Sequence, residues 1–229
     1  MRILALDTAT TACSVAVWED ESVRARRFEM MPRGQSEALI PMVVDVLGEA
    51  SLSFSDFDLL AVTVGPGAFT GLRIGLAAAR GMALAAGLPC VGVTTFEAVA
   101  EGIAPEERAG TDVLIALDAK RADVYAQFFL SNLEPTSAPL ALPPAELAGH
   151  IVSTRLLIAG DASLRVAEAA SVCGIEAVIS AAPGVADAAH VAAIAARRWQ
   201  AGETGQPPEP LYLRPPDVTM SANGGRLRP

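Results

Sequence analysis

The sequence predicts an α/β protein in which two lobes of mixed sheets are flanked by helices. Short apolar runs alternate with helical patterns along the first hundred residues, a Gly-rich turn at residues 65–67 joins a strand to a long apolar helix, and a pair of strands beyond residue 110 repeats the opening hairpin. The 229 residues can form one large domain or two small ones. A hydrophobic content of 52% is typical of a globular chain.

The chain opens with a pattern typical of an antiparallel meander. Strands are predicted over residues 2–7, 13–18 and 22–29, with a polar turn at 8–11. A helix is then predicted over residues 35–49, where Leu39 and Val43 follow helical spacing while Ile40 and Val44 widen the apolar face. This helix has more apolar surface than one sheet requires.

The segment 62–89 is the centre of the prediction. A strand over 59–64 runs into Gly65 and Gly67, which allow backbone angles that a side chain would forbid. We expect Thr70 to cap a helix over residues 70–86 and Gly87 to end it. A Gly-rich turn before a helix could also hold a phosphate, but the Gly-Lys-Ser/Thr ending of a P-loop is missing.

The helix predicted over 70–86 is apolar on several sides, and Gly71, Gly75, Ala79 and Ala83 form a nearly flat stripe. It is either an interior helix packed on its own sheet or a helix that also contacts a partner. Its only charges, Arg73 and Arg80, lie about two turns or ~10 Å apart on nearly one face. They either reach solvent at the rim of the lobe, or Arg73 pairs with an acidic group of a partner or a nucleotide.

The order of elements predicts a duplicated, actin-like architecture. A strand at 90–93 and a helix at 94–102 complete one half of such a fold, and the polar break at 105–110 is the predicted boundary. The lobe over residues 1–105 would then carry the partner or dimer interface. The lobe over 106–229 would be a reduced copy.

The second lobe has predicted strands and helices of its own. These are strands at 113–118, 124–130 and 156–159, a short helix after Pro144, helices at 163–172 and 186–199, and a tail from Gly202 that is rich in Pro and Gly. We expect Asp187 or a neighbouring residue to begin the last helix. The tail is expected to lie along a surface or to be partly disordered.

The composition argues against several classes of protein. A net charge of −9 makes a broad nucleic-acid groove improbable, so contact with RNA is expected only through a partner. Three widely spaced cysteines suit reduced thiols better than disulfides or zinc ligands. No apolar run reaches the length of a membrane span, and the first residues predict a strand rather than a signal peptide. We therefore expect a cytoplasmic protein.

Five segments resemble the bacterial TsaB family, also called YeaZ. They read LALDTATTACSVAVW, VTVGPGAFTGLRIGLAAARGMALA, LPCVGVTTFEAVA, ALDAKRADVYAQFF and PLYLRPP. The resemblance implies an actin-like (ASKHA, ribonuclease H-like) fold related to TsaD, the enzyme that completes threonylcarbamoyladenosine beside the anticodon of tRNAs reading ANN codons. It further implies a subunit that TsaD requires, which acts with the ATPase TsaE. One departure is Gln35 before Ser36-Glu37, where the family commonly has His.

The resemblance also bears on whether this chain is a non-catalytic subunit or an enzyme. TsaD carries an HxxxH metal pair where this chain has Thr95 and Val99, so no metal site is expected. His150 and His190 are expected to be structural. A divergent ATP-dependent enzyme or a metalloprotease-like hydrolase is the alternative to a non-catalytic activating subunit, and it would need intact glycine-rich phosphate loops.

Two sets of site residues follow. A vestigial or shared nucleotide site would use Asp7, Thr8, Gly65, Gly67 and Asp118, with ATP or ADP held only at a junction with TsaD and TsaE. A partner-binding surface would use residues of the two apolar helices, namely Leu39, Val43, Leu72, Arg73, Leu76, Ala79, Arg80 and Ala83. The isolated chain is expected to form a homodimer through this surface.

Overall fold

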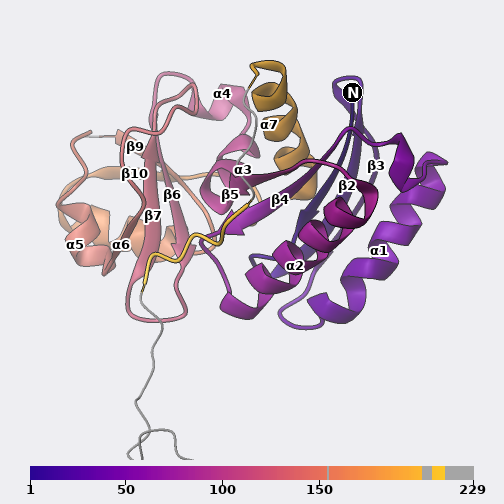
Figure 1. Cartoon of the computed structure of the whole chain (residues 1–229). Coiled ribbons are helices and arrows are strands. Elements are labelled where there is room, and N and C mark those ends of the chain that lie inside the picture. Colours follow the sequence, from indigo (N-terminus) through magenta and orange to yellow (C-terminus); the bar gives the residue numbers. More distant parts are fainter. Residues whose placement is uncertain (154, 203–207, 215–229) are drawn as a thin grey trace, which may run out of the picture.

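Two five-stranded mixed sheets lie side by side in the computed structural model, which describes residues 1–153, 155–202 and 208–214 (Figure 1). The first sheet has the order β3-β2-β1-β4-β5 and the second the order β10-β9-β6-β7-β8. The first consists of β1 (Arg2–Asp7), β2 (Ala12–Glu19), β3 (Ser22–Met30), β4 (Leu59–Gly65) and β5 (Cys90–Thr94). The second consists of β6 (Asp112–Asp118), β7 (Val124–Phe129), β8 (Leu140–Leu142), β9 (Arg155–Ala159) and β10 (Glu176–Ile179).

The two sheets repeat one pairing pattern, which confirms the predicted actin-like duplication. In the first sheet β1 pairs antiparallel with β2 and parallel with β4. In the second sheet β6 pairs antiparallel with β7 and parallel with β9. The first strand of each lobe is therefore central, and a hairpin extends the sheet on one side of it.

Helices cover both faces of the first sheet. They are α1 (Gln35–Ala50) and α2 (Phe69–Ala86) on one face, and α3 (Thr95–Glu101) and α7 (Ala188–Gln200) on the other. The remaining helices are a 3-10 turn (Phe54–Asp56), α4 (Pro105–Arg108), α5 (Pro144–Ala148) and α6 (Ser163–Val172). Alternate residues of β1 divide the core, since Leu4 and Leu6 pack toward α1 and α2, whereas Ile3 and Ala5 pack toward α3 and α7. No helix in the described part of the chain is long and apolar enough to cross a membrane.

The last helix returns to the first sheet. α7 packs on β1, β2 and β4, although it lies beyond the boundary predicted near residue 105. The helix starts after Asp187, close to the start that the sequence predicted, and the side chain of this N-cap residue accepts a hydrogen bond from the N–H of Ala189. The same carboxylate pairs with Arg26 of β3. The division of the chain into lobes at residue 105 stays a prediction.

The start of α2 differs from the prediction. The helix begins at Phe69 with Ala68 as its N-cap, and no side chain caps it. Thr70 lies one residue inside the first turn, so the prediction that it caps the helix is wrong. The N–H of Ala68 instead donates to the carbonyl of Ala9 at 2.8 Å, which fixes the entry to the helix. The end is as predicted, because Gly87 adopts a left-handed conformation at the C-cap.

Candidate functional site

The turn after β1 packs directly on the glycine-bearing start of α2. A Cβ atom on Gly67 would lie 2.2 Å from the carbonyl oxygen of Ala9, and one on Gly71 would lie 2.2 Å from that of Thr8. The hydroxyl of Thr8 also donates to the carbonyl of Gly71 at 2.7 Å. Only glycine allows two backbones to approach so closely. The close packing of the two backbones therefore explains the glycine at position 67 without a bound phosphate.

Asp7 lies at the end of β1 and is fully buried. Its Oδ1 accepts hydrogen bonds from the hydroxyl of Thr63 at 2.6 Å and from the N–H of Ala9 at 3.1 Å. Its Oδ2 is buried without a hydrogen-bond partner among the described residues. Burial raises the pKa of Asp7 to about 7, although the two hydrogen bonds oppose this increase. This carboxyl group therefore titrates near neutral pH.

A cleft of about 330 Å³ lies between the two lobes. Gly67 and Asp118 both line it, so the structure brings together two of the residues predicted for a nucleotide site. Asp7, Thr8 and Gly65 are not among its lining residues; Ala9 and Thr10 line it instead. Gly65 is buried under the segment 208–214, since a Cβ atom there would lie 2.9 Å from the carbonyl oxygen of Leu211. Nucleotide binding at these five residues stays a prediction.

Asp118 and Lys120 of the cleft pair with each other, and Arg33 is a second cation in its lining. Lys120 Nζ lies 3.0 Å from Oδ2 of Asp118, and Arg165 lies 3.4 Å from its Oδ1. Partial burial acts to raise the pKa of Asp118, but the hydrogen bonds and charge of Lys120, together with Arg165, hold it below its ordinary value. Asp161 accepts a hydrogen bond from the N–H of Asp118, and burial raises its pKa. A phosphate entering the cleft would compete with Asp118 for Lys120.

Sequence reasoning missed Lys120 and Asp161 as cleft residues. In the sequence, Lys120 follows the strand-ending carboxylate Asp118 by two residues, in a turn that corresponds to the turn after Asp7. Asp161 follows Gly160 in a second turn at the carboxyl end of β9, next to β6 in the sheet. The carboxyl ends of neighbouring parallel strands meet at one edge of a sheet. That rule could have predicted that Lys120, after β6, and Asp161, after β9, lie in the same cleft.

The positions of the HxxxH pair lie in the core. Thr95 and Val99 are both buried in α3, and the hydroxyl of Thr95 has no hydrogen-bond partner among the described residues. No group of three or more His, Cys, Asp or Glu side chains that could hold a metal ion occurs in the described ranges. Neither position offers a ligand atom to a metal in the cleft.

The surface of α1 and α2 is not made of the residues that the sequence assigned to it. Most of them are buried against the chain's own sheet, namely Leu39, Val43, Leu72, Leu76, Ala79 and Ala83. The prediction that they face a partner is therefore wrong, because these side chains of α1 and α2 pack on the first sheet. The exposed apolar side chains are their neighbours: Ile40 and Val44 on α1 are 49% and 62% exposed, and Leu84 on α2 is 86% exposed.

Arg73 and Arg80 are exposed on α2 as expected, and both bind the segment 208–214. Arg73 Nε donates to the hydroxyl of Tyr212 at 3.1 Å, and its guanidinium lies 3.7 Å from the ring centroid of Phe69. Arg80 donates to the carbonyl of Pro208. The N–H of Leu211 donates to the carbonyl of Val64 at 2.7 Å. The described part of the tail is thus fastened along the surface of the first lobe.

The paired sheets and the cleft between them define an actin-like α/β protein of two lobes. The activator of the 2-hydroxyisocaproyl-CoA dehydratase from Clostridium difficile, solved with bound ADPNP, has a TM-score of 0.50 to this chain over 90% of this chain and 99% of its own, at 12% identity. That likeness concerns the fold alone. YeaZ from Pseudomonas aeruginosa has a TM-score of 0.78 at 30% identity, over 93% of this chain and 99% of its own. The chain belongs to the TsaB/YeaZ family.

Sequence comparisons agree with this assignment. The tRNA threonylcarbamoyladenosine biosynthesis protein TsaB of Escherichia coli is 49% identical over 125 residues, which are 55% of this chain and 53% of that relative. An uncharacterized protein of Mycobacterium bovis is 31% identical over 218 residues, or 94% of this chain and 93% of its own. The family model for TsaD, tRNA N6-adenosine threonylcarbamoyltransferase, matches residues 29–136. The match to the E. coli protein spans about half of that protein's length.

Proposed function

We propose that this chain is a non-catalytic subunit in the threonylcarbamoyladenosine modification of tRNA and that it activates a TsaD-type transferase by docking on it. Membership of the TsaB/YeaZ family supports the pathway. The match of residues 29–136 to the TsaD model supports a partner of the same fold, since related subunits often pair through equivalent elements. The modified position would be the adenosine beside the anticodon of ANN-decoding tRNAs.

One observation carries the docking proposal: two adjacent helices on the outside of the first lobe leave large apolar side chains in solvent. α1 and α2 pack next to each other on one face of the first sheet (Figure 1). Ile40, Val44 and Leu84 project from them into solvent. Exposed apolar patches on soluble proteins often mark interaction sites. We call the outer surface of α1 and α2, which carries these three residues, the docking face and expect a helix pair of the transferase to pack against it.

The same face gives the isolated protein a way to self-associate. An isologous dimer would place α1 and α2 of one copy against those of another, and the transferase would then compete with self-association. TsaE and a nucleotide, ATP or ADP, would join at a junction between subunits rather than in the isolated chain. Light scattering of the isolated protein, with and without the transferase, measures this exchange.

The cleft supports a non-catalytic role. Lys120 pairs with Asp118, and Asp7 is not in the lining, where Ala9 and Thr10 lie instead. A phosphoryl-transfer site needs a glycine-rich loop with open backbone N–H groups, whereas Asp118 is followed by Ala119, Lys120, Arg121 and Ala122. Thr95 and Val99 offer no metal pair. The chemistry would therefore belong to the partner.

Reconstitution tests the proposed function. A mixture of a TsaD-type transferase, TsaE, threonylcarbamoyl-adenylate and tRNA is assembled with or without this chain, and the modified nucleoside is measured. Turnover that requires the chain is the expected result. Full turnover without it would show that the assigned role is wrong.

A further inference from the structure

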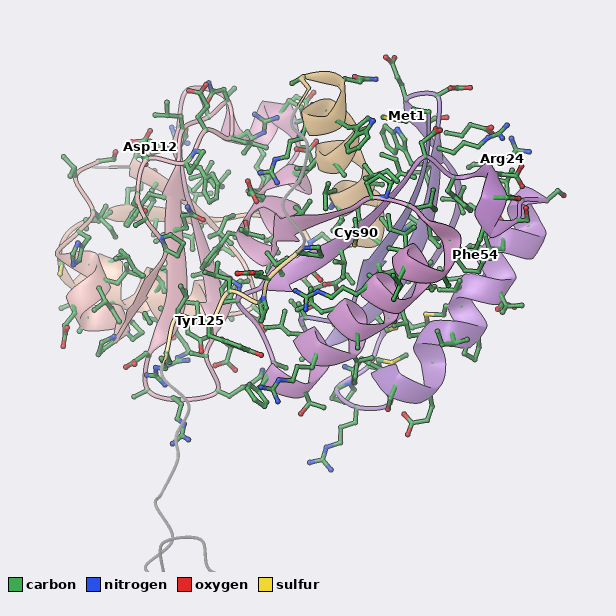
Figure 2. All side chains as sticks on the ribbon, viewed as in Figure 1. Met1, Arg24, Phe54, Cys90, Asp112 and Tyr125 are labelled. Carbon is green, nitrogen blue, oxygen red and sulfur yellow. The ribbon has the colours of Figure 1, made fainter. Side chains whose placement is uncertain are left out.

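A second cavity, of about 470 Å³, shares Pro66 and Gly67 with the cleft but has different walls. The start of α2, the turn between β6 and β7, the strand β7 and the segment 211–214 form it. Figure 2 shows Tyr125 on β7, next to the described part of the tail. The volume falls within the ~300–1,000 Å³ of small-molecule pockets. The three exposed apolar residues of the docking face make no part of this cavity.

Three aromatic rings line the cavity. The ring centroids of Phe69 and Tyr212 are 5.5 Å apart with an interplanar angle of 33°, and Tyr125 also lines the cavity. Arg73 holds the first two rings, since its guanidinium lies over Phe69 and its Nε donates to the hydroxyl of Tyr212. These contacts fix the rings before any ligand arrives, which reduces the entropy lost on binding.

The charged lining of the cavity has one sign. Arg73, Arg121 and Arg214 line it, and no acidic side chain does so among the described residues. Arg214 pairs with Asp123, which lies outside the lining. In a chain of net charge −9, such a group of guanidinium side chains is a local exception. It favours an anionic ligand with oxygen atoms that can meet a guanidinium fork.

We propose that this cavity binds one nucleoside monophosphate unit, with its base against an aromatic ring of the lining and its phosphate on the arginines. Aromatic rings and guanidinium planes are the groups on which unpaired bases stack. An acidic peptide would use the arginines but leave the rings without a planar partner, and a neutral aromatic ligand would leave the charges unused. The unit comes either from an unpaired stretch of RNA or from a free nucleotide. Direct binding of RNA would differ from the expectation, based on the net charge of −9, that this chain contacts RNA only through a partner.

The test uses the full chain and two probes. A fluorescein-labelled single-stranded A6 RNA is titrated by anisotropy, and AMP is titrated by calorimetry. Tighter binding of the RNA, with log K falling by roughly 0.7 per phosphate contacted as log salt rises, assigns the site to a strand. Equal affinity for both probes assigns it to a free nucleotide. Binding of neither probe at millimolar concentration contradicts the proposal.

Variants locate the binding. Tyr212→Ala should weaken binding about tenfold, because stacking on one ring is lost, whereas Tyr212→Phe keeps the ring and should bind within about twofold of the wild type. Arg73→Gln should weaken binding to a similar extent. Arg27→Ala removes one partly buried positive charge from β3, outside the lining of the cavity, and should have no effect. Thermal unfolding checks that each variant is folded. Wild-type affinity in both Tyr212→Ala and Arg73→Gln would overturn the proposal.

Discussion

The hydroxyl of Thr63 on β4 donates a 2.6 Å hydrogen bond to Oδ1 of Asp7 on β1, and both side chains are buried. The bond joins Asp7, the last residue of β1, to Thr63, which lies two residues before the end of the neighbouring parallel strand β4. Because Oδ2 has no partner among the described residues, the bond compensates only part of the cost of burying a charge there. Asp7 is therefore a source of pH-dependent stability.

The contribution of Asp7 to the free energy of unfolding should fall as the pH rises from about 4 to about 7. Burial raises the pKa of Asp7 from 3.8 to about 7, with a smaller contribution from the charge of Asp187. Between these two values the folded state keeps the proton that the unfolded state releases, so raising the pH favours unfolding. The contribution is complete below about pH 4 and lost above about pH 7.

Urea denaturation of the wild type and of Asp7→Asn at pH 5 and pH 8 measures this effect. The variant cannot ionise at this position, so the wild type should lose more stability than the variant between the two pH values. Taking the difference removes the contribution of all other titrating groups. An equal loss in both proteins would show that Asp7 does not titrate in this range.

Gly67→Ala should destabilise the protein by about 1–3 kcal/mol. Its Cβ atom would lie 2.2 Å from the carbonyl oxygen of Ala9, so one of the two backbones must move. Gly81→Ala on α2 is the matched control, since a Cβ atom there meets nothing within 4 Å. That change should leave stability unchanged or raise it by up to about 1 kcal/mol. Thermal unfolding distinguishes the two, and a wild-type melting temperature for Gly67→Ala would contradict the close packing.

Asp187→Ala should cost about 1–2 kcal/mol of stability, because it removes the N-cap of α7 and the partner of Arg26 together. Asp187→Asn keeps an oxygen that can accept from the N–H of Ala189 and loses only the ion pair. Since Arg26 is partly exposed, that loss should be below about 1 kcal/mol. Chemical denaturation measures the stability of both variants. If Asp187→Asn is no more stable than Asp187→Ala, the helix cap does not account for the contribution of Asp187.

The elements could be predicted from the sequence where the apolar pattern is strong. β1 and α6 occur at the predicted bounds, and α2 begins one residue earlier than predicted. The edge strands β8 and β10 were not predicted, because three or four residues carry too little periodicity to separate a strand from a loop. The return of α7 to the first sheet depends on long-range packing, which no local pattern encodes.

The orientation of α1 shows why the candidate surface was harder to predict than the helix. Leu39 and Val43 are buried whereas Ile40 and Val44 are exposed, and the two pairs differ by a rotation of about 100°. A helix that is apolar over this whole arc does not indicate which part faces the sheet. The pairing of Lys120 with Asp118 could be guessed from their spacing, but its place in the cleft required the folded chain.

The docking face is tested most directly by the rate of tRNA modification in the reconstituted system. Val44→Glu and Leu84→Glu each place a charge on this face, and the double variant should lower the rate at least tenfold, to the level without this chain, because a buried unpaired carboxylate opposes docking. Val172→Glu changes an exposed residue at the end of α6 in the other lobe, so it is the matched control and should keep the full rate. Circular dichroism checks that the double variant and this control are folded. A double variant that is folded and supports the wild-type rate would contradict the account.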